Sequence, residues 1–141
     1  MSVKRWDRQP SPRVTDARRH GSFWDRNCSG RIAAMFAKRI SSSAQFAPDK
    51  MGKSTLMRGD LLFVGVNAFE PGQEHAPHVH EGQDKLYVIL EGTGVVHIGE
   101  QAEILSAGDA AYAPSGVAHS IRNPGPARLV TMVVLAPPPQ K

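Results

Sequence analysis

The feature that most constrains the fold is a regular alternation of short apolar runs with Gly and Pro after residue 47. Runs of four to eight residues suit β-strands, whereas helices need longer periodic segments. Turn signals separate about eight such runs, a pattern that is typical of an all-β sandwich or barrel. We expect strands over residues 61–69, 75–81, 86–90, 95–98, 102–105, 110–113, 117–122 and 128–135.

The chain divides into two parts by charge. Residues 1–46 hold ten Lys or Arg and three Asp, a net +7, whereas residues 47–141 hold seven Lys or Arg and ten Asp or Glu, a net −3. We therefore expect a basic extension over 1–46 that is irregular, partly helical (over residues 31–40) or disordered, followed by a β-domain over 47–141. No DNA- or RNA-binding module accompanies the extension, which argues against nucleic acid as a partner.

Several classes of protein are excluded by simple counts. The apolar runs are far shorter than the roughly 20 residues that a membrane-spanning helix needs, and no run near the N-terminus has the pattern of a signal peptide. Cys28 is the single cysteine, so an internal disulfide is impossible. Residues 52–55 read like the end of a phosphate-binding loop, but Ala47 stands where that loop needs glycine. We expect a cytoplasmic protein with a small-molecule ligand.

Three histidines are placed to share one metal ion. His78 and His80 occupy alternate positions, so on an extended strand their side chains point to the same face. His119 follows about forty residues later, on a strand of its own. Neutral imidazole suits first-row transition metals. We expect one divalent ion of Fe, Mn, Ni or Zn.

Glycine, proline and asparagine flank these histidines at fixed intervals, and together they resemble the two motifs of small single-domain cupins. The motifs span residues 72–123, and the flanking strands extend the resemblance to about 48–137. The resemblance implies a double-stranded β-helix, that is, a jelly-roll barrel of two facing antiparallel sheets. The matching positions are Gly72, His78, His80 and Gly92 in the first motif, and Gly108, Pro114, Gly116, His119 and Asn123 in the second.

Lys85 departs from the first motif, because many cupins have a metal-binding glutamate there. A protonated lysine has no lone pair for a metal, and its charge opposes the ion. Three outcomes are open: a three-histidine site with free positions, an oxygen ligand from Gln83 or Asp84, or a weakened metal site in which Lys85 binds an anionic group. We favour the three-histidine site, with Gln83 as the fourth protein ligand.

Strand alternation makes further expectations about this region. If Lys85 faces the interior, Tyr87 and Ile89 do so too, and an apolar set faces outward and needs a cover from the basic extension or from a partner subunit. His75 lies three residues before His78, so a regular strand turns it away as a rim residue. The apolar residues of strand 86–90 that would face outward are Leu86, Val88 and Leu90.

His97 lies in a strand of its own and is a candidate substrate contact or proton carrier. An orientation toward solvent is equally open for this side chain.

The leading functional hypothesis is a metal-dependent enzyme of dioxygenase, isomerase or lyase type that acts on a small anionic substrate. Lys85 and His97 are its expected catalytic residues. The absence of the glutamate makes the site one charge more positive, which favours anions. The alternatives are a non-catalytic module that binds or senses a small ligand, and a purely structural metal site. A homodimer is also expected, with strand 129–135 offering a sheet edge.

Overall fold

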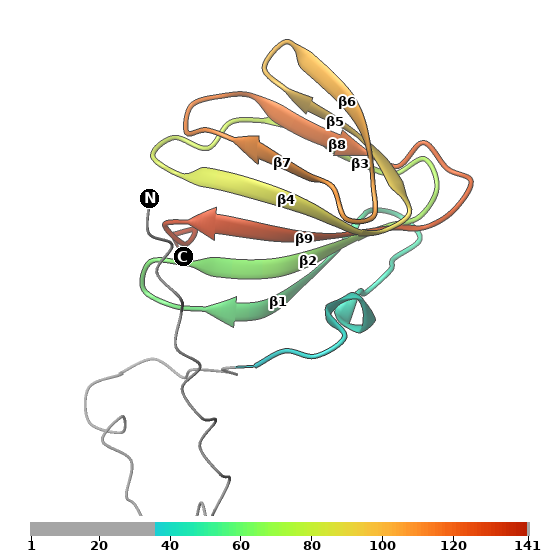
Figure 1. Cartoon of the computed structure of the whole chain (residues 1–141), viewed down its shortest axis with the longest axis horizontal. Helices are drawn as coiled ribbons and strands as arrows, with labels where there is room; N and C mark the ends of the chain where they lie inside the picture. Colours follow the sequence, from blue (N-terminus) through green and yellow to red (C-terminus); the bar gives the residue numbers. More distant parts are fainter. Residues whose placement is uncertain (1–35, 141) are drawn as a thin grey trace, which may run out of the picture. The chain divides into compact units, whose positions relative to one another are not determined.

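The computed structural model describes residues 36–140, which form nine β-strands and one short 3-10 helix (Figure 1). The strands make two antiparallel sheets, of order β1-β2-β9-β4-β7 and β3-β8-β5-β6. The elements are η1 (Ile40–Ser43), β1 (Gly52–Arg58), β2 (Phe63–Phe69), β3 (Glu74–His78), β4 (Asp84–Glu91), β5 (Thr93–Ile98), β6 (Gln101–Ser106), β7 (Ala110–Ala113), β8 (His119–Arg122) and β9 (Leu129–Ala136).

The core lies between the two sheets, where alternate residues of their strands meet. Tyr87 and Ile89 reach it from β4, while Val96 and Ile121 reach it from β5 and β8 of the other sheet. These side chains are almost fully buried and form one apolar cluster with Phe69, Leu129 and Val133. Two facing antiparallel sheets around a shared core confirm the predicted all-β jelly-roll fold.

β1 is the strand that the sequence pattern did not predict. It is an edge strand that pairs only with β2 among the described residues, and polar residues dominate its sequence Gly-Lys-Ser-Thr-Leu-Met-Arg. Such a strand lacks the apolar signal of a buried one, so the sequence pattern does not mark it. Residues 52–55 are therefore β-strand and not a nucleotide-binding loop.

β9 corrects the expectation about the sheet edge. This strand lies between β2 and β4, with backbone partners along both sides (Figure 1). Its side chains from Leu129 to Thr131 are buried, as expected for the middle of a sheet. Because both rows of its backbone hydrogen bonds are used within the sheet, strand 129–135 offers no edge to a second subunit.

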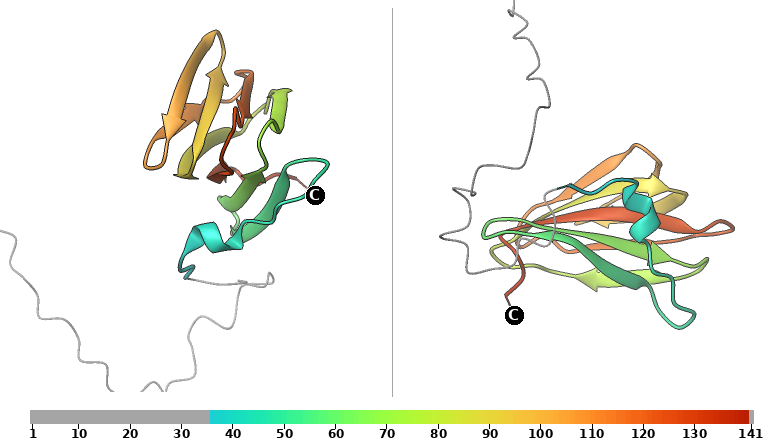
Figure 2. Two further views of the ribbon diagram at one scale, coloured as in Figure 1. Left: turned by 90° about the vertical axis from the view of Figure 1, so that its right-hand side faces the viewer. Right: turned by 90° about the horizontal axis from the view of Figure 1, so that it is seen from below.

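The outer face of the five-stranded sheet is partly covered by the segment before β1. In β4, Lys85, Tyr87 and Ile89 are buried, and the residues between them are half-buried, which confirms the predicted alternation. The helix η1 lies against β2 and β9 (Figure 2). Val66 and Ala68 alternate with the inward residues of β2 and are fully buried nonetheless, so this cover excludes water from part of the outer face.

The helix expected over residues 31–40 differs from the structure. Residues 31–35, with most of the basic extension, lie outside the described residues, and residues 36–39 are not helical. Arg39 has a left-handed φ of 49°, which an α-helix does not accommodate. Within the described part, helical structure begins at Ile40 and ends at Ser43.

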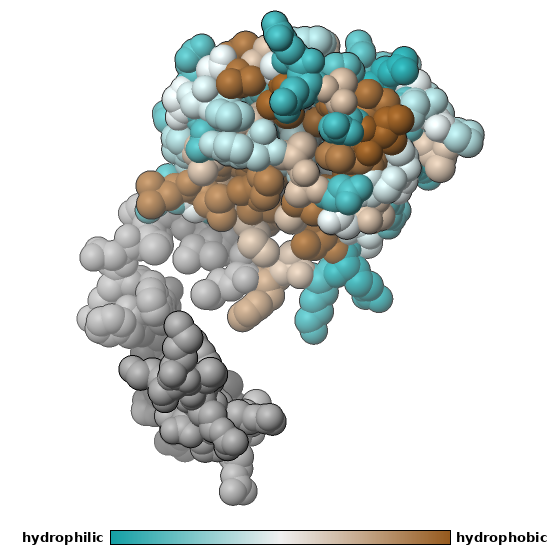
Figure 3. Space-filling view, turned by 45° about the horizontal axis from the view of Figure 1, so that its top comes forward, coloured by the Kyte–Doolittle hydropathy of each residue, from teal (hydrophilic) through white to brown (hydrophobic). Residues whose placement is uncertain are grey.

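The surface of the described part mixes apolar and hydrophilic residues. On the face in Figure 3, apolar residues gather in separate patches among hydrophilic ones. None of the helices in residues 36–140 is long and apolar enough to cross a membrane.

Candidate metal centre

The three histidines converge between β3 and β8. His78 and His119 are directly paired across these two strands, and His80 follows β3 by two residues. One ligand atom from each of the three residues lies within 4.8 Å of the others. The ring centroid of His78 is 4.9 Å from that of His80 and 4.4 Å from that of His119. This grouping is what the spacing of the histidines in the sequence predicts.

Hydrogen bonds to the backbone fix how two of the rings face the centre. His78 Nδ1 lies 2.7 Å from the carbonyl oxygen of Ala76, and His119 Nδ1 lies 2.9 Å from that of Val117. A nitrogen that donates to a carbonyl carries the proton, so Nε2 keeps its lone pair. The Nε2 atom of His119 is buried without a hydrogen-bond partner. An orphaned acceptor beside two further imidazoles fits a bound transition metal.

The surroundings keep these rings in the neutral form that can donate a lone pair. Burial, followed by smaller contributions that include the charge of Lys85, lowers the pKa of His78 to about 4. Burial is also the main cause that lowers the pKa values of His80 and His119. These shifts disfavour imidazolium at neutral pH.

Lys85 lies at the centre of this arrangement. Its side chain is on β4 and the residue is 3% exposed, with Nζ 3.3 Å from His78 Nε2 and 4.6 Å from the ring centroid of Tyr87. Burial first and the charge of Lys53 second lower the pKa of Lys85 to about 8. Lys85 Nζ is the donor in this contact, because His78 carries its ring proton on Nδ1. The acceptor, His78 Nε2, is the nitrogen that a metal would use.

Gln83 and Asp84, the two expected oxygen donors, differ in their surroundings. Gln83 is buried and its Nε2 donates to the carbonyl oxygen of Pro137 at 2.6 Å. This bond uses the amide nitrogen, so Oε1 is the atom available to a ligand. Asp84 is exposed, and its Oδ1 accepts a hydrogen bond from the backbone N–H of Ser115 at 3.0 Å, which holds its carboxylate at the turn before β8.

His75 faces the site, contrary to the expectation from regular alternation. Its ring centroid is 4.0 Å from that of His78, and burial first and Lys85 second lower its pKa to about 3. The register shifts between these two residues, because His75 pairs with Ile121 and His78 with His119. The three residues from His75 to His78 on β3 therefore span the same distance as the two residues from Ile121 to His119 on β8. This β-bulge brings His75 to the inner face. No sequence pattern marks this bulge.

His97 points away from the three histidines, because it pairs with Ser120, the neighbour of His119, and its side chain is on the outward face of β5. On β5, Val96 is buried in the core and His97 is exposed, and it lines a shallow hollow on the outer face with Glu74 and Arg122. The structure therefore does not bring His97 to Lys85.

A cavity opens beside the histidines and offers room for a ligand. Its volume is about 360 Å³, within the range of small-molecule sites. Its polar wall includes His75, His80 and Lys85 together with Lys53 and Asn67, two further residues that the sequence pattern does not assign to the site. Its apolar wall is formed by Phe63, Val133, Leu135 and Pro139.

Comparison with known proteins gives a consistent result. An oxalate-binding protein of Thermotoga maritima is 38% identical over 85 residues, which cover 60% of this chain and 69% of that protein. The structure of TT1209 from Thermus thermophilus is 39% identical with a TM-score of 0.70, and the match covers 73% of this chain and 98% of that one. A Klebsiella pneumoniae protein with a double-stranded β-helix domain is 27% identical with a TM-score of 0.68, over 74% and 90% of the two chains.

The model of the cupin domain family matches residues 65–135, about half of the chain. This range contains most of β2, all of β3 to β8 and nearly all of β9, with all three clustered histidines. The matched fold, the antiparallel sheets and the histidine positions agree, and the chain belongs to the cupin domain family.

Proposed function

We propose that this protein binds a divalent transition metal through His78, His80 and His119 and uses it to hold a small carboxylate ligand. The observation that carries the proposal is the convergence of three neutral imidazoles, one with an unpartnered buried Nε2, beside a buried lysine. A divalent ion there would supply Lewis-acid activation of a coordinated oxygen. Gln83 Oε1 is the proposed fourth protein ligand.

Lys85 supports an anionic ligand over a neutral one. In the described structure its Nζ donates to His78 Nε2, but an imidazole nitrogen has one lone pair, which a metal would occupy. Lys85 would then be a buried ammonium without its acceptor, and a buried charge needs a partner of opposite sign. A carboxylate oxygen supplies that partner. The oxalate-binding relative, at 38% identity, makes oxalate the first ligand to test.

The proposed activity is an enzymatic one of dioxygenase, isomerase or lyase type, with Lys85 orienting or protonating the bound substrate. The second candidate is a module that binds its ligand without chemistry, which the similarity to an oxalate-binding protein favours. Incubating the metal-loaded protein with oxalate and with keto acids, with and without oxygen, separates the two. Ligand turnover supports the enzyme, and saturable binding without turnover supports the module.

The central experiment measures metal content and ligand binding on the same protein. We expect about one Mn, Fe, Ni or Zn per chain after loading and removal of free metal, with oxalate binding by calorimetry only to the loaded form. His119→Ala should abolish both. His97→Ala is the matched control, because it removes an exposed imidazole from the outer face and should leave the metal content unchanged. Equal metal content in wild type and His119→Ala would overturn the proposal.

A further inference from the structure

A second lysine lines the cavity from the edge strand of the same five-stranded sheet. Lys53 is on the edge strand β1, opposite Asn67 of β2, and both residues line the cavity with Lys85. Two strands, β2 and β9, lie between β1 and β4. Adjacent strands are about 4.8 Å apart, so three such steps put about 14 Å between β1 and β4 across the sheet. The register adds an offset along the strands, because Lys53 is in line with Ile89 of β4 through Asn67 and Thr131, four residues from Lys85.

No acidic side chain balances these two lysines in the cavity. None of its lining residues is an Asp or Glu, and the salt bridge found within residues 36–140 joins Arg128 to Glu70 elsewhere. The charge of Lys53 is felt at the histidines, since it contributes to lowering the pKa values of His75, His80 and Lys85. Two ammonium groups that face one cavity without a counter-charge favour a ligand with two negative groups.

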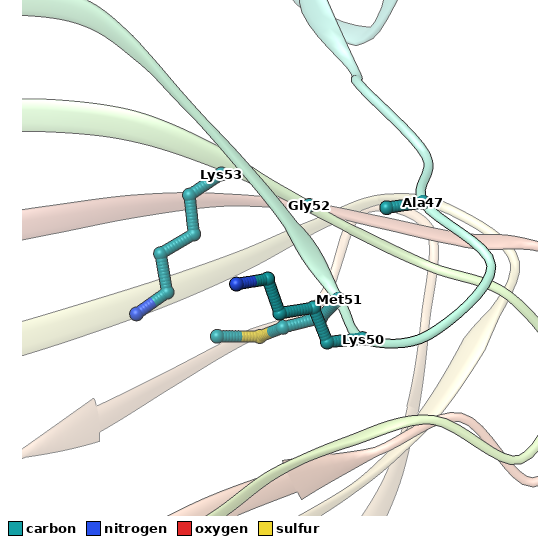
Figure 4. Close-up of a pocket in the computed structure, with 5 residues that line it drawn as sticks. All are labelled: Ala47, Lys50, Met51, Gly52 and Lys53. Carbon is teal, nitrogen blue, oxygen red and sulfur yellow. The ribbon is translucent and has the colours of Figure 1, made fainter.

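The wall between the two lysines is apolar. Val133 and Leu135 of β9 and Phe63 of β2 line the same cavity, together with Gly65. A Cβ on Gly65 would lie 2.9 Å from the carbonyl oxygen of Ser54 and 3.0 Å from the Phe63 ring. On the outer side of Lys53, a second hollow of about 510 Å³ is lined by Lys50, Met51 and Lys53. Figure 4 shows the Lys50 and Lys53 side chains extending to the same side of β1, so the β1 end of the cavity is the more cationic rim.

We infer that Lys53 is a specificity-determining residue that binds the far anionic group of an elongated dianion, whose near group is held at the histidines and Lys85. The inference rests on the proposed function and deepens it by naming the ligand class: two acid groups joined by a short apolar body. Oxalate, with its two carboxylates directly bonded, fills only the metal end. A longer aliphatic diacid engages both lysines and places its methylenes on the apolar wall.

The test compares acids of different length on the metal-loaded full chain by calorimetry. The probes are oxalate, succinate, adipate and hexanoate, the last being a monoacid with the same number of carbons as adipate. Wild type should bind adipate about tenfold more tightly than hexanoate. Lys53→Gln should remove that advantage and leave oxalate affinity unchanged. Lys38→Gln is the matched control, because Lys38 is exposed and lines neither cavity, and it should behave like wild type.

The outcomes separate the two proposals. Adipate binding no tighter than hexanoate in wild type, or an unchanged adipate preference in Lys53→Gln, overturns the role of Lys53 and leaves the metal site standing if oxalate still binds. Failure of the loaded wild type to bind oxalate or any longer acid overturns both. A loss of oxalate affinity in Lys53→Gln equal to that of adipate also contradicts the inference, since it would place Lys53 at the metal end.

Discussion

At the scale of single residues, Lys85 sets the charge beside the three histidines of the candidate metal centre. It occupies the position where the family motif has a carboxylate, and it contacts the nitrogen that a metal needs. The identity of this residue and the grouping of the three histidines follow from the sequence. Strand alternation predicts only that Lys85, Tyr87 and Ile89 share one face, and the structure shows that this face is the inner one. Its hydrogen bond to His78 does not, because the conformation of a long side chain depends on packing against Tyr87 and on the shape of the cavity.

Replacing Lys85 with glutamate should strengthen metal binding and weaken oxalate binding. In Lys85→Glu a negative carboxylate replaces a positive group beside His78, so metal affinity should rise by tenfold or more. Oxalate affinity of the loaded protein should fall, because the cationic partner of the ligand is gone. Competition with a chromogenic chelator measures the first effect and calorimetry the second. Lys38→Glu makes the same charge change far from the site and should alter neither, and weaker metal binding in Lys85→Glu would contradict this assignment.

At the scale of elements, turns and strand register set the directions of the functional side chains. The turns were readable from glycine positions, and Gly72, Gly92, Gly108 and Gly116 all have positive φ, a conformation that glycine tolerates. Two features could not be predicted from the sequence, the bulge in β3 and the strand β1. The bulge in β3 depends on how β3 and β8 pair, and the polar edge strand β1 pairs with β2 and has no fully buried residue.

Two glycines with similar backbone conformations offer a matched test of turn packing. Gly82 has φ 67° and open space where a Cβ would lie, whereas a Cβ on Gly92, at φ 78°, would come 2.2 Å from the carbonyl oxygen of Arg128. Gly82→Ala should therefore lower the free energy of unfolding by about 1–2 kcal/mol, the cost of a left-handed alanine. Gly92→Ala adds a backbone clash and should cost more than about 3 kcal/mol.

Urea denaturation of the two variants measures both values. Equal losses of stability in Gly82→Ala and Gly92→Ala would show that the approach of Arg128 to the turn is absent in solution.

At the scale of the whole molecule, the candidate metal centre lies between the two sheets. His78 and His119 belong to the four-stranded sheet, while Lys85 and the apolar wall belong to the five-stranded one. The sequence predicted this architecture from strand spacing and the motif, but not that β9 lies at the centre of its sheet. Sheet order depends on contacts between residues far apart in the chain, which local patterns do not encode. The expected homodimer remains a prediction without an assigned edge.

Metal binding should therefore stabilise the folded chain as a unit. A ligand that binds only the native state, at a concentration of 100 times its Kd, adds about 2.7 kcal/mol of stability. For a domain of this size that corresponds to a rise in Tm of roughly 10 °C. Scanning fluorimetry with Mn, Fe, Ni and Zn should show the rise for the metal that the site accepts. His119→Ala should show none, and an equal rise in this variant would place the stabilising ion elsewhere.

The segment after β9 has a consequence for how the protein is handled. Pro137 anchors Gln83, Pro139 forms part of the ligand cavity, and Arg58 donates to the carbonyl oxygen of Pro139. A group attached to the chain beside Pro139 would thus be tethered at the mouth of the cavity. A bulky affinity tag there would obstruct guest molecules, whereas a small fluorophore on the same tether would report their entry.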